Sequence, residues 1–152
     1  MKLKWFLLAT AVAGTLDLSA AFIFAGRADM EPLAVLQFVA SGPLGDGALK
    51  SPAYGIAGIL VHYGIMACMV AAFMLAATRV SVLVRHPWIS GVLYGLLLWF
   101  VMYWLVRPMR WENLHPSTNP RSIAEQLFCH LILVGIPIAL ITRAAMDTPD
   151  PR

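Results

Sequence analysis

The chain has 152 residues, of which 60% are hydrophobic and 12% are charged. An average soluble domain carries about 25% charged residues, so this composition indicates an integral membrane protein. The formal net charge is only +3, and the basic residues lie between apolar runs instead of in a cluster. We therefore expect the partner to be a lipid bilayer and not nucleic acid. The length suits a single transmembrane domain over residues 1–152.

The first apolar run extends from about Trp5 to Gly26 and follows Lys2 and Lys4. A basic start before an apolar stretch is also found in signal peptides, but this run is 22 residues long. About 20 apolar residues are enough to cross a bilayer. Because three further apolar runs follow, we expect a retained first span and not a cleaved leader.

A shorter apolar stretch follows the first span and begins at Pro32. Proline is well suited to the first helical position, and the residues from Ser41 to Pro43 predict that this helix ends near Ala40. A helix of this length cannot cross a membrane. We expect it to lie in the outer interface or to fold back over the bundle as a lid.

Three more spans are predicted at about 54–78, 88–106 and 123–142. The third ends before Arg107 and Pro108, and Pro137 predicts a kink in the fourth. The tail, residues 144–152, is expected to be mobile. The expected fold is therefore all-α, an integral membrane four-helix bundle with a short outer interfacial helix.

Gly91 and Gly95 lie four residues apart within the third span. This spacing lets two helix backbones approach closely. It predicts packing inside the bundle, and the alternative is a Gly91 and Gly95 face that binds a second copy of the chain or another membrane protein.

The distribution of basic residues sets the expected orientation. With both termini inside, six Lys and Arg residues lie on the inner side and five on the outer side. The acidic residues Asp29, Glu31, Asp46, Glu112 and Glu125 all fall on the outer side. We therefore expect a multi-pass protein with both termini in the cytoplasm.

The apolar runs contain three ionisable side chains that share one depth. Asp17 lies nine residues before Gly26, while His62 and His130 lie eight and seven residues after the starts of the second and fourth spans. At 1.5 Å per residue, all three are about 10 to 14 Å below the outer boundary. Gln126 precedes His130 by four residues and so shares its helix face. These four residues predict one intramembrane polar layer.

Three hypotheses can explain a carboxylate in this layer, where a lone charge costs roughly 2.5 to 3.5 kcal/mol. In the first, Asp17 and the histidines form a protonatable site for a proton or a solute, facing a cavity that opens to the outside. In the second, His62 and His130 hold a haem iron, or bind a divalent metal together with Asp17. In the third, Asp17 bonds a histidine as a structural clasp between helices.

The sequence contains no catalytic signature. A nucleophile elbow, a phosphate-binding loop, a dinucleotide-binding glycine pattern and a kinase motif are all missing. We therefore expect no enzymatic activity, no catalytic residue and no obligatory cofactor.

Four stretches carry a resemblance to known proteins: AGTLDLSAAFIFAG, LQFVASGPLG, LVHYGIMA and HLILVGIPIALITR. Together they resemble a group of small bacterial inner-membrane proteins with four spans, and the layout is distantly similar to that of YagU-like proteins. The likeness covers residues 13–143. It implies a location in the bacterial inner membrane and the same four-span plan, and it implies no catalytic residue. The chain departs from YagU-like proteins because it is short and lacks much of their first extracytoplasmic loop.

Overall fold

The computed structural model describes residues 2–112 and 114–148, and all of its regular structure in these ranges is helical. Four helices in the described part of the chain are long and apolar enough to cross a membrane, which confirms the all-α bundle and indicates a multi-pass membrane protein. The first is α1 (Leu3–Gly26) and the second is α3 (Tyr54–Ala77). The third runs over Pro87–Arg110 and the fourth over Pro120–Asp147. At 1.5 Å per residue, 24 residues reach about 36 Å, enough for a hydrocarbon core of about 30 Å.

The third and fourth spans each contain a change of helical winding. The third consists of α5 (Pro87–Phe100), the π-helix η2 (Val101–Val106) and α6 (Arg107–Arg110). The fourth consists of α7 (Pro120–Leu127), the π-helix η3 (Phe128–Gly135) and α8 (Ile136–Asp147). Short π-helical segments are rare and occur frequently at functional sites.

Each π-helix ends two residues before a proline, Pro108 in one case and Pro137 in the other. A proline lacks an N–H and its ring collides with the carbonyl four residues earlier. In both spans that carbonyl belongs to the π-helix, whose wider winding makes room for the ring. Both helices therefore continue through their proline. The prediction that the third span ends at residue 106 was wrong, because the helix extends to Arg110.

The fourth span is also longer than the predicted 123–142. It begins at Pro120, where the side chain of Asn119 accepts a hydrogen bond from the backbone N–H of Arg121 at 3.0 Å. It ends at Asp147, so the first residues of the predicted tail are helical. The rest of that tail, residues 149–152, lies outside the described residues.

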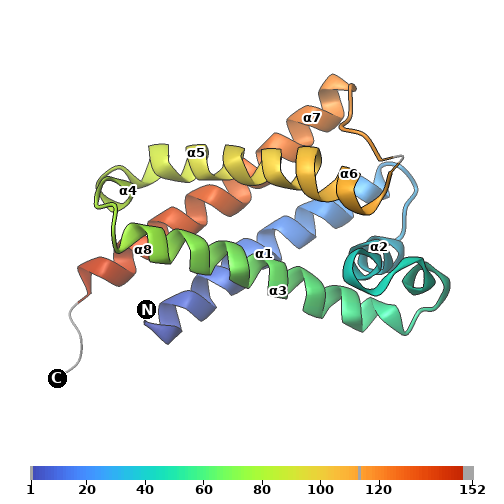
Figure 1. Cartoon of the computed structure of the whole chain (residues 1–152), viewed down its shortest axis with the longest axis horizontal. Helices are drawn as coiled ribbons and strands as arrows, with labels where there is room; N and C mark the ends of the chain where they lie inside the picture. The colour runs from blue at the N-terminus through green and yellow to red at the C-terminus, as the bar shows by residue number, and fades with distance from the viewer. Residues whose placement is uncertain (1, 113, 149–152) are drawn as a thin grey trace.

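Three short helices connect the spans: α2 (Pro32–Leu44), the 3-10 helix η1 (Asp46–Lys50) and α4 (Val82–Arg85). The predicted short helix is α2, and it runs four residues beyond Ala40 because Pro43 is accommodated in its last turn. The helix is capped by Gly45, which follows its last residue and whose φ of 82° is easily adopted only by glycine. Figure 1 shows α2 lying across one end of the bundle, with α4 at the opposite end.

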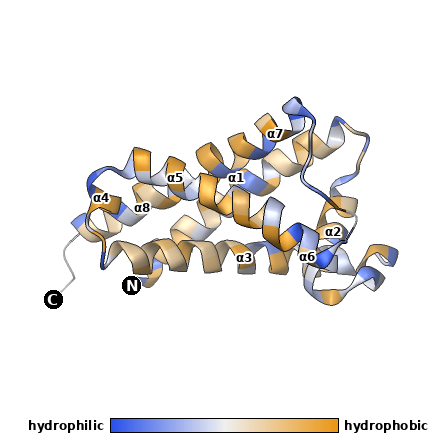
Figure 2. Cartoon of the chain, turned by 45° about the horizontal axis from the view of Figure 1, so that its top comes forward, coloured by the Kyte–Doolittle hydropathy of each residue, from blue (hydrophilic) through white to orange (hydrophobic). Residues whose placement is uncertain are grey.

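The start of α1 and the end of α8 lie at the same end of the bundle (Figure 1), which we call the chain-end side. The side chain of Lys2 donates a hydrogen bond to the backbone carbonyl of Thr148 there. We call the end that carries α2 and α6 the lid side. The spans between them consist mainly of hydrophobic residues (Figure 2), and many of their large apolar side chains are exposed.

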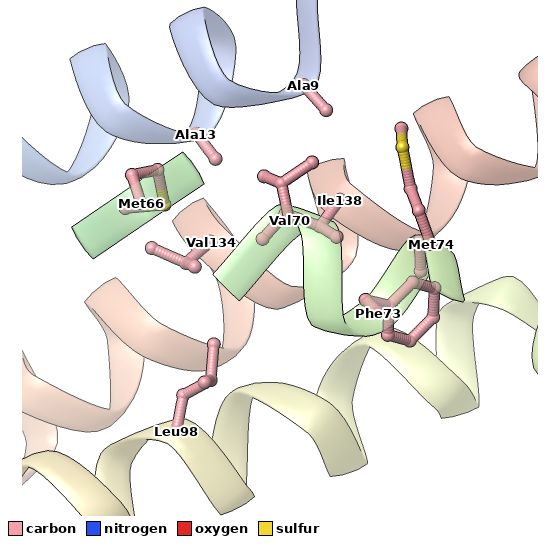
Figure 3. Close-up of a cluster of buried hydrophobic side chains, with 10 residues drawn as sticks. Ala9, Ala13, Met66, Val70, Phe73, Met74, Leu98, Val134 and Ile138 are labelled. Atoms are coloured by element: carbon pink, nitrogen blue, oxygen red, sulfur yellow. The ribbon is translucent and has the colours of Figure 1, made fainter. Parts of the chain in front are cut away.

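The close-packed core fills the chain-end half of the bundle. Figure 3 shows Val70 and Phe73 of α3 in one cluster with Ile138 of α8 and with the small side chains of Ala9 and Ala13 on α1. These five residues are at most 2% exposed. Alanines on α1 let the neighbouring helices approach closely, and the bulky side chains then fill the space between them.

Gly91 and Gly95 bring α5 into backbone contact with the fourth span. A Cβ atom added at Gly91 would lie 2.7 Å from the Cα atom of Ile136, and one at Gly95 would collide with the carbonyl oxygen of His130. Gly135 faces them from η3. The glycine face is therefore buried within the chain, and it does not offer the free surface for a partner that its spacing suggested.

Candidate intramembrane site

A cavity of about 490 Å³ lies in the lid-side half of the bundle. It extends from the rim at α2 and α6 down to Met69 and Val134 in the middle of the spans, and exposed Pro43 lines its rim. Most of its wall is apolar. Its polar side chains are Asp17, His62, Tyr103, Arg107, Arg110 and His130. A mainly apolar cavity with a few polar groups is typical of small-molecule sites.

Three of the four residues predicted to form a polar layer line this one cavity: Asp17, His62 and His130. The fourth, Gln126, lies behind His130. Its side-chain oxygen accepts a hydrogen bond from Nε1 of Trp99 at 3.2 Å, and its side-chain nitrogen donates to Ser122 at 2.9 Å. Gln126 therefore supports the fourth span and does not face the cavity.

Each histidine is held by one ring nitrogen. Nε2 of His62 donates to the backbone carbonyl of Gly14 at 2.9 Å, and Nδ1 of His130 donates to the carbonyl of Gln126 at 3.0 Å. A carbonyl only accepts, so these nitrogens carry the protons. The second ring nitrogen of each histidine has no hydrogen-bond partner among the described residues and can accept a proton, a hydrogen bond or a metal bond.

Asp17 has a different environment. No described residue forms a hydrogen bond or an ion pair with its carboxylate, although His130, Tyr103 and Cys129 are close enough to interact with it electrostatically. The bond to a histidine that a structural clasp requires is therefore not formed among the described residues. The acid faces a cavity and not a fixed partner.

The ring of Tyr103 lies at the centre of the site. It meets the ring of His130 edge-on, with 5.7 Å between the ring centroids. The guanidinium group of Arg107 lies over the same ring, 4.7 Å from its centroid. The Nε atom of Arg107 is buried and has no hydrogen-bond partner among the described residues. Sequence reasoning missed Arg107, because Arg107 and Pro108 together resemble the end of a span.

Helix α2 forms a lid over the cavity, and a second arginine, in α6, binds it. Arg110 donates to the carbonyl of Ser41 at 2.7 and 3.1 Å and to that of Gly42 at 2.8 Å, and it forms an ion pair with Asp46 at 2.7 Å. Carbonyls at a helix C-terminus lack partners in their own helix and favour a cation. Arg110 thus caps α2 from another helix and closes one side of the cavity.

Aromatic stacking and glycine contacts position the rest of the lid. The rings of Phe38 and Trp111 stack, with their centroids 4.6 Å apart. On the other side, Gly58 of α3 lies so close to Leu36 that a Cβ atom would collide with its backbone. The lid is therefore held against both walls of the cavity.

Among the described residues, no group of three or more His, Cys, Asp and Glu side chains could hold a metal ion. Asp17, His62 and His130 line the same cavity but do not form such a group. The expected divalent-metal set is therefore not supported. A haem iron needs only two axial nitrogens, so that alternative does not depend on this criterion.

In comparisons with known proteins, no family model, no curated protein and no solved structure matches this chain. The resemblance to YagU-like proteins therefore stays a prediction.

Proposed function

We propose that this protein is a multi-pass protein of the bacterial inner membrane that handles a proton or a small solute in its lid-side cavity. Both termini lie in the cytoplasm, so the lid and the cavity mouth face the outside. This orientation is supported by the start of α1 and the end of α8 at one side, by the acidic residues near the lid and by the exposed rim at Pro43.

One observation carries the proposal. Asp17 places a carboxylate inside a membrane-spanning bundle, on a cavity of about 490 Å³, without a hydrogen bond or ion pair to any described residue. Ionisable side chains within membrane spans are costly and mark pathways for ions, protons or substrates. A purely structural acid would be bonded across the helices.

The residues around Asp17 suit this role. His62 reaches the cavity from α3 and His130 from η3, and each offers a ring nitrogen that can exchange a proton. Tyr103 and Arg107 reach it from the third span. Tyr103 belongs to η2 of the third span and His130 to η3 of the fourth, and the contact between their rings places the two π-helices side by side at the same depth. The cavity ends at the close-packed core, so the proton or solute enters from the lid side.

The test uses the purified protein in liposomes that contain a pH-sensitive dye. An outside acid step is applied with the membrane potential clamped, and we expect proton uptake that is lost in Asp17→Asn. The matched control is Asp147→Asn, since Asp147 is exposed at the far end of α8 and pairs with Arg143 at 3.5 Å. Uptake no faster than in empty liposomes, or equal uptake by wild type and Asp17→Asn, would contradict a proton-handling role.

A second candidate is a haem held by His62 and His130. It is favoured by the hydrogen bonds of the two rings, because a ligating histidine usually donates its other N–H to a carbonyl or carboxylate. Purified protein would then show a Soret absorption band that is lost in His62→Ala and in His130→Ala. A colourless preparation would exclude this candidate.

A further inference from the structure

Two opposite charges on the cavity wall form no ion pair with any described residue. One is the Asp17 carboxylate, and the other is Arg107, which contacts the uncharged side chain of Tyr103 and whose buried Nε atom has no hydrogen-bond partner among the described residues. Arg110, the other cation on the wall, is already satisfied by Asp46 and by two backbone carbonyls. A ligand that fills the cavity would displace water from both groups, and a charge that loses water without gaining a partner is costly, so the ligand must satisfy Asp17 and Arg107.

Asp17 and Arg107 do not pair with each other, yet both act electrostatically on Tyr103. Arg107 follows Tyr103 by four residues and lies nearer the lid, while Asp17 lies in the layer of His130. The cavity thus offers a cation toward the lid and an anion deeper in the bundle. A ligand with a single charge would satisfy one of them and leave the other unpaired.

The rest of the wall is suited to an apolar group. Met66, Met69 and Met102 line the cavity from two helices, and methionine adapts its shape to varied ligands. Ile65 and Met69 also line a shallow apolar groove on the outside of the bundle between α3 and α5. The cavity therefore adjoins the lipid-facing surface through these two side chains.

We propose that the cavity binds a zwitterion, a molecule that carries an acidic oxyanion and an ammonium group on an apolar body. The oxyanion lies at Arg107, the ammonium group at Asp17, and the apolar part against the methionines. This inference rests on the proposed function and names the class of its solute. The same chemistry is present in a free apolar amino acid and in the headgroup of an aminophospholipid.

The first experiment separates charge from shape with three probes of similar size. Calorimetric titration of the protein in nanodiscs compares L-leucine, leucinamide, which lacks the carboxylate, and 4-methylpentanoate, which lacks the ammonium group. We expect leucine to bind at least about tenfold more tightly than either analogue, the size of effect expected for one lost charge-assisted hydrogen bond. Equal binding of leucine and an analogue would exclude a free apolar amino acid as the source of the zwitterion and leave the lipid headgroup to be tested.

The second arm tests the lipid source. Native mass spectrometry after extraction from mixed bilayers compares the retention of phosphatidylethanolamine with that of phosphatidylglycerol, which has no ammonium group. Preferred retention of phosphatidylethanolamine supports the zwitterion and identifies its source as a lipid. If neither leucine nor phosphatidylethanolamine binds in preference to its analogues, the proposal fails.

Two variants test whether Arg107 binds the oxyanion and Asp17 binds the ammonium group. Arg107→Gln and Asp17→Asn should each weaken the binding of the preferred zwitterion at least about tenfold. Arg79 is exposed and away from the cavity, so Arg79→Gln should leave this binding unchanged.

The experiments can contradict the zwitterion site and the proton-handling role independently of each other. If Asp17→Asn abolishes proton uptake and no zwitterion binds, the zwitterion is excluded and proton handling stands. If a zwitterion binds through both charges and wild type takes up no protons, the ligand assignment stands without proton handling.

Discussion

The two halves of the bundle use the same four spans in different ways. In the chain-end half, Val70, Phe73 and Ile138 are at most 2% exposed and fill the space between the helices. In the lid-side half, the same spans enclose about 490 Å³, and its wall carries Asp17 and Arg107, neither of which forms an ion pair with a described residue. We call the close-packed chain-end half the dense half. Its rigid packing helps to keep the charged side chains on the cavity wall at a fixed separation.

The largest effect is expected from removing bulk in the dense half. Phe73→Ala deletes a ring that packs on Tyr94 with 4.9 Å between centroids. We expect the free energy of unfolding to fall by about 3 to 5 kcal/mol, because the close-packed site cannot collapse. Unfolding in mixed micelles, followed by tryptophan fluorescence, measures this change. The matched variant Met102→Ala, on the cavity wall, should cost less than half as much, and equal losses would remove the distinction between the halves.

A smaller loss is expected at the backbone contact that joins the third and fourth spans. A Cβ atom in Gly95→Ala would collide with the carbonyl of His130, which cannot rotate away. We expect a loss of about 1 to 3 kcal/mol in the same unfolding measurement. Gly64→Ala is the control, because nothing lies within 4 Å of the added atom there. Similar stability of the two variants would show that the helices do not pack this closely.

Substitution of Arg110 should loosen the lid helix α2 without changing the packing of the dense half. Arg110→Gln removes the ion pair with Asp46 and the charge that caps α2. Because the Asp46 carboxylate is exposed, the expected loss is only about 1 kcal/mol. Hydrogen exchange should become faster in α2 and stay unchanged around Val70. Unchanged exchange in α2 would mean that other contacts hold the lid, and Arg121→Gln serves as the exposed control.

The smallest effect on stability is expected at the most unusual residue. Asp17→Asn should change the free energy of unfolding by less than about 0.5 kcal/mol, since the carboxylate has no bonded partner among the described residues. Thermal unfolding in detergent measures it. A loss several times larger would favour the structural clasp and would count against a functional site.

The four spans and the shared depth of Asp17, His62 and His130 could be predicted because both depend on simple lengths. Apolar run length determines which segments cross a bilayer, and the helical rise converts residue numbers into depth. An error of a few residues in a span boundary changes neither the number of spans nor, by more than a few ångströms, the depth of a residue within its span. This is why Asp17 and the two histidines line one cavity although every span boundary shifted except the end of α1 and the start of α3.

The arginines of the site could not be predicted in the same way. Arg107 next to Pro108 has the pattern of a helix end, and nothing local in the sequence shows that a π-helix will carry the span through the proline. The role of Arg110 depends on carbonyls of Ser41 and Gly42, more than 60 residues away in the chain. Gln126 was misplaced for a related reason, because sharing a helix face with His130 does not show which of them meets the cavity.

The π-helix η2 also changes the direction in which Arg107 points. In a regular α-helix each residue turns about 100°, so the nine residues from Leu98 to Arg107 would turn about 900° and place the two on opposite faces. Leu98 belongs to the core, so Arg107 would then point into lipid. A π-helix turns less per residue because each ring spans five residues. This lag turns Arg107 back toward the cavity that it lines, so a helical wheel drawn for the third span would place Arg107 on the wrong face.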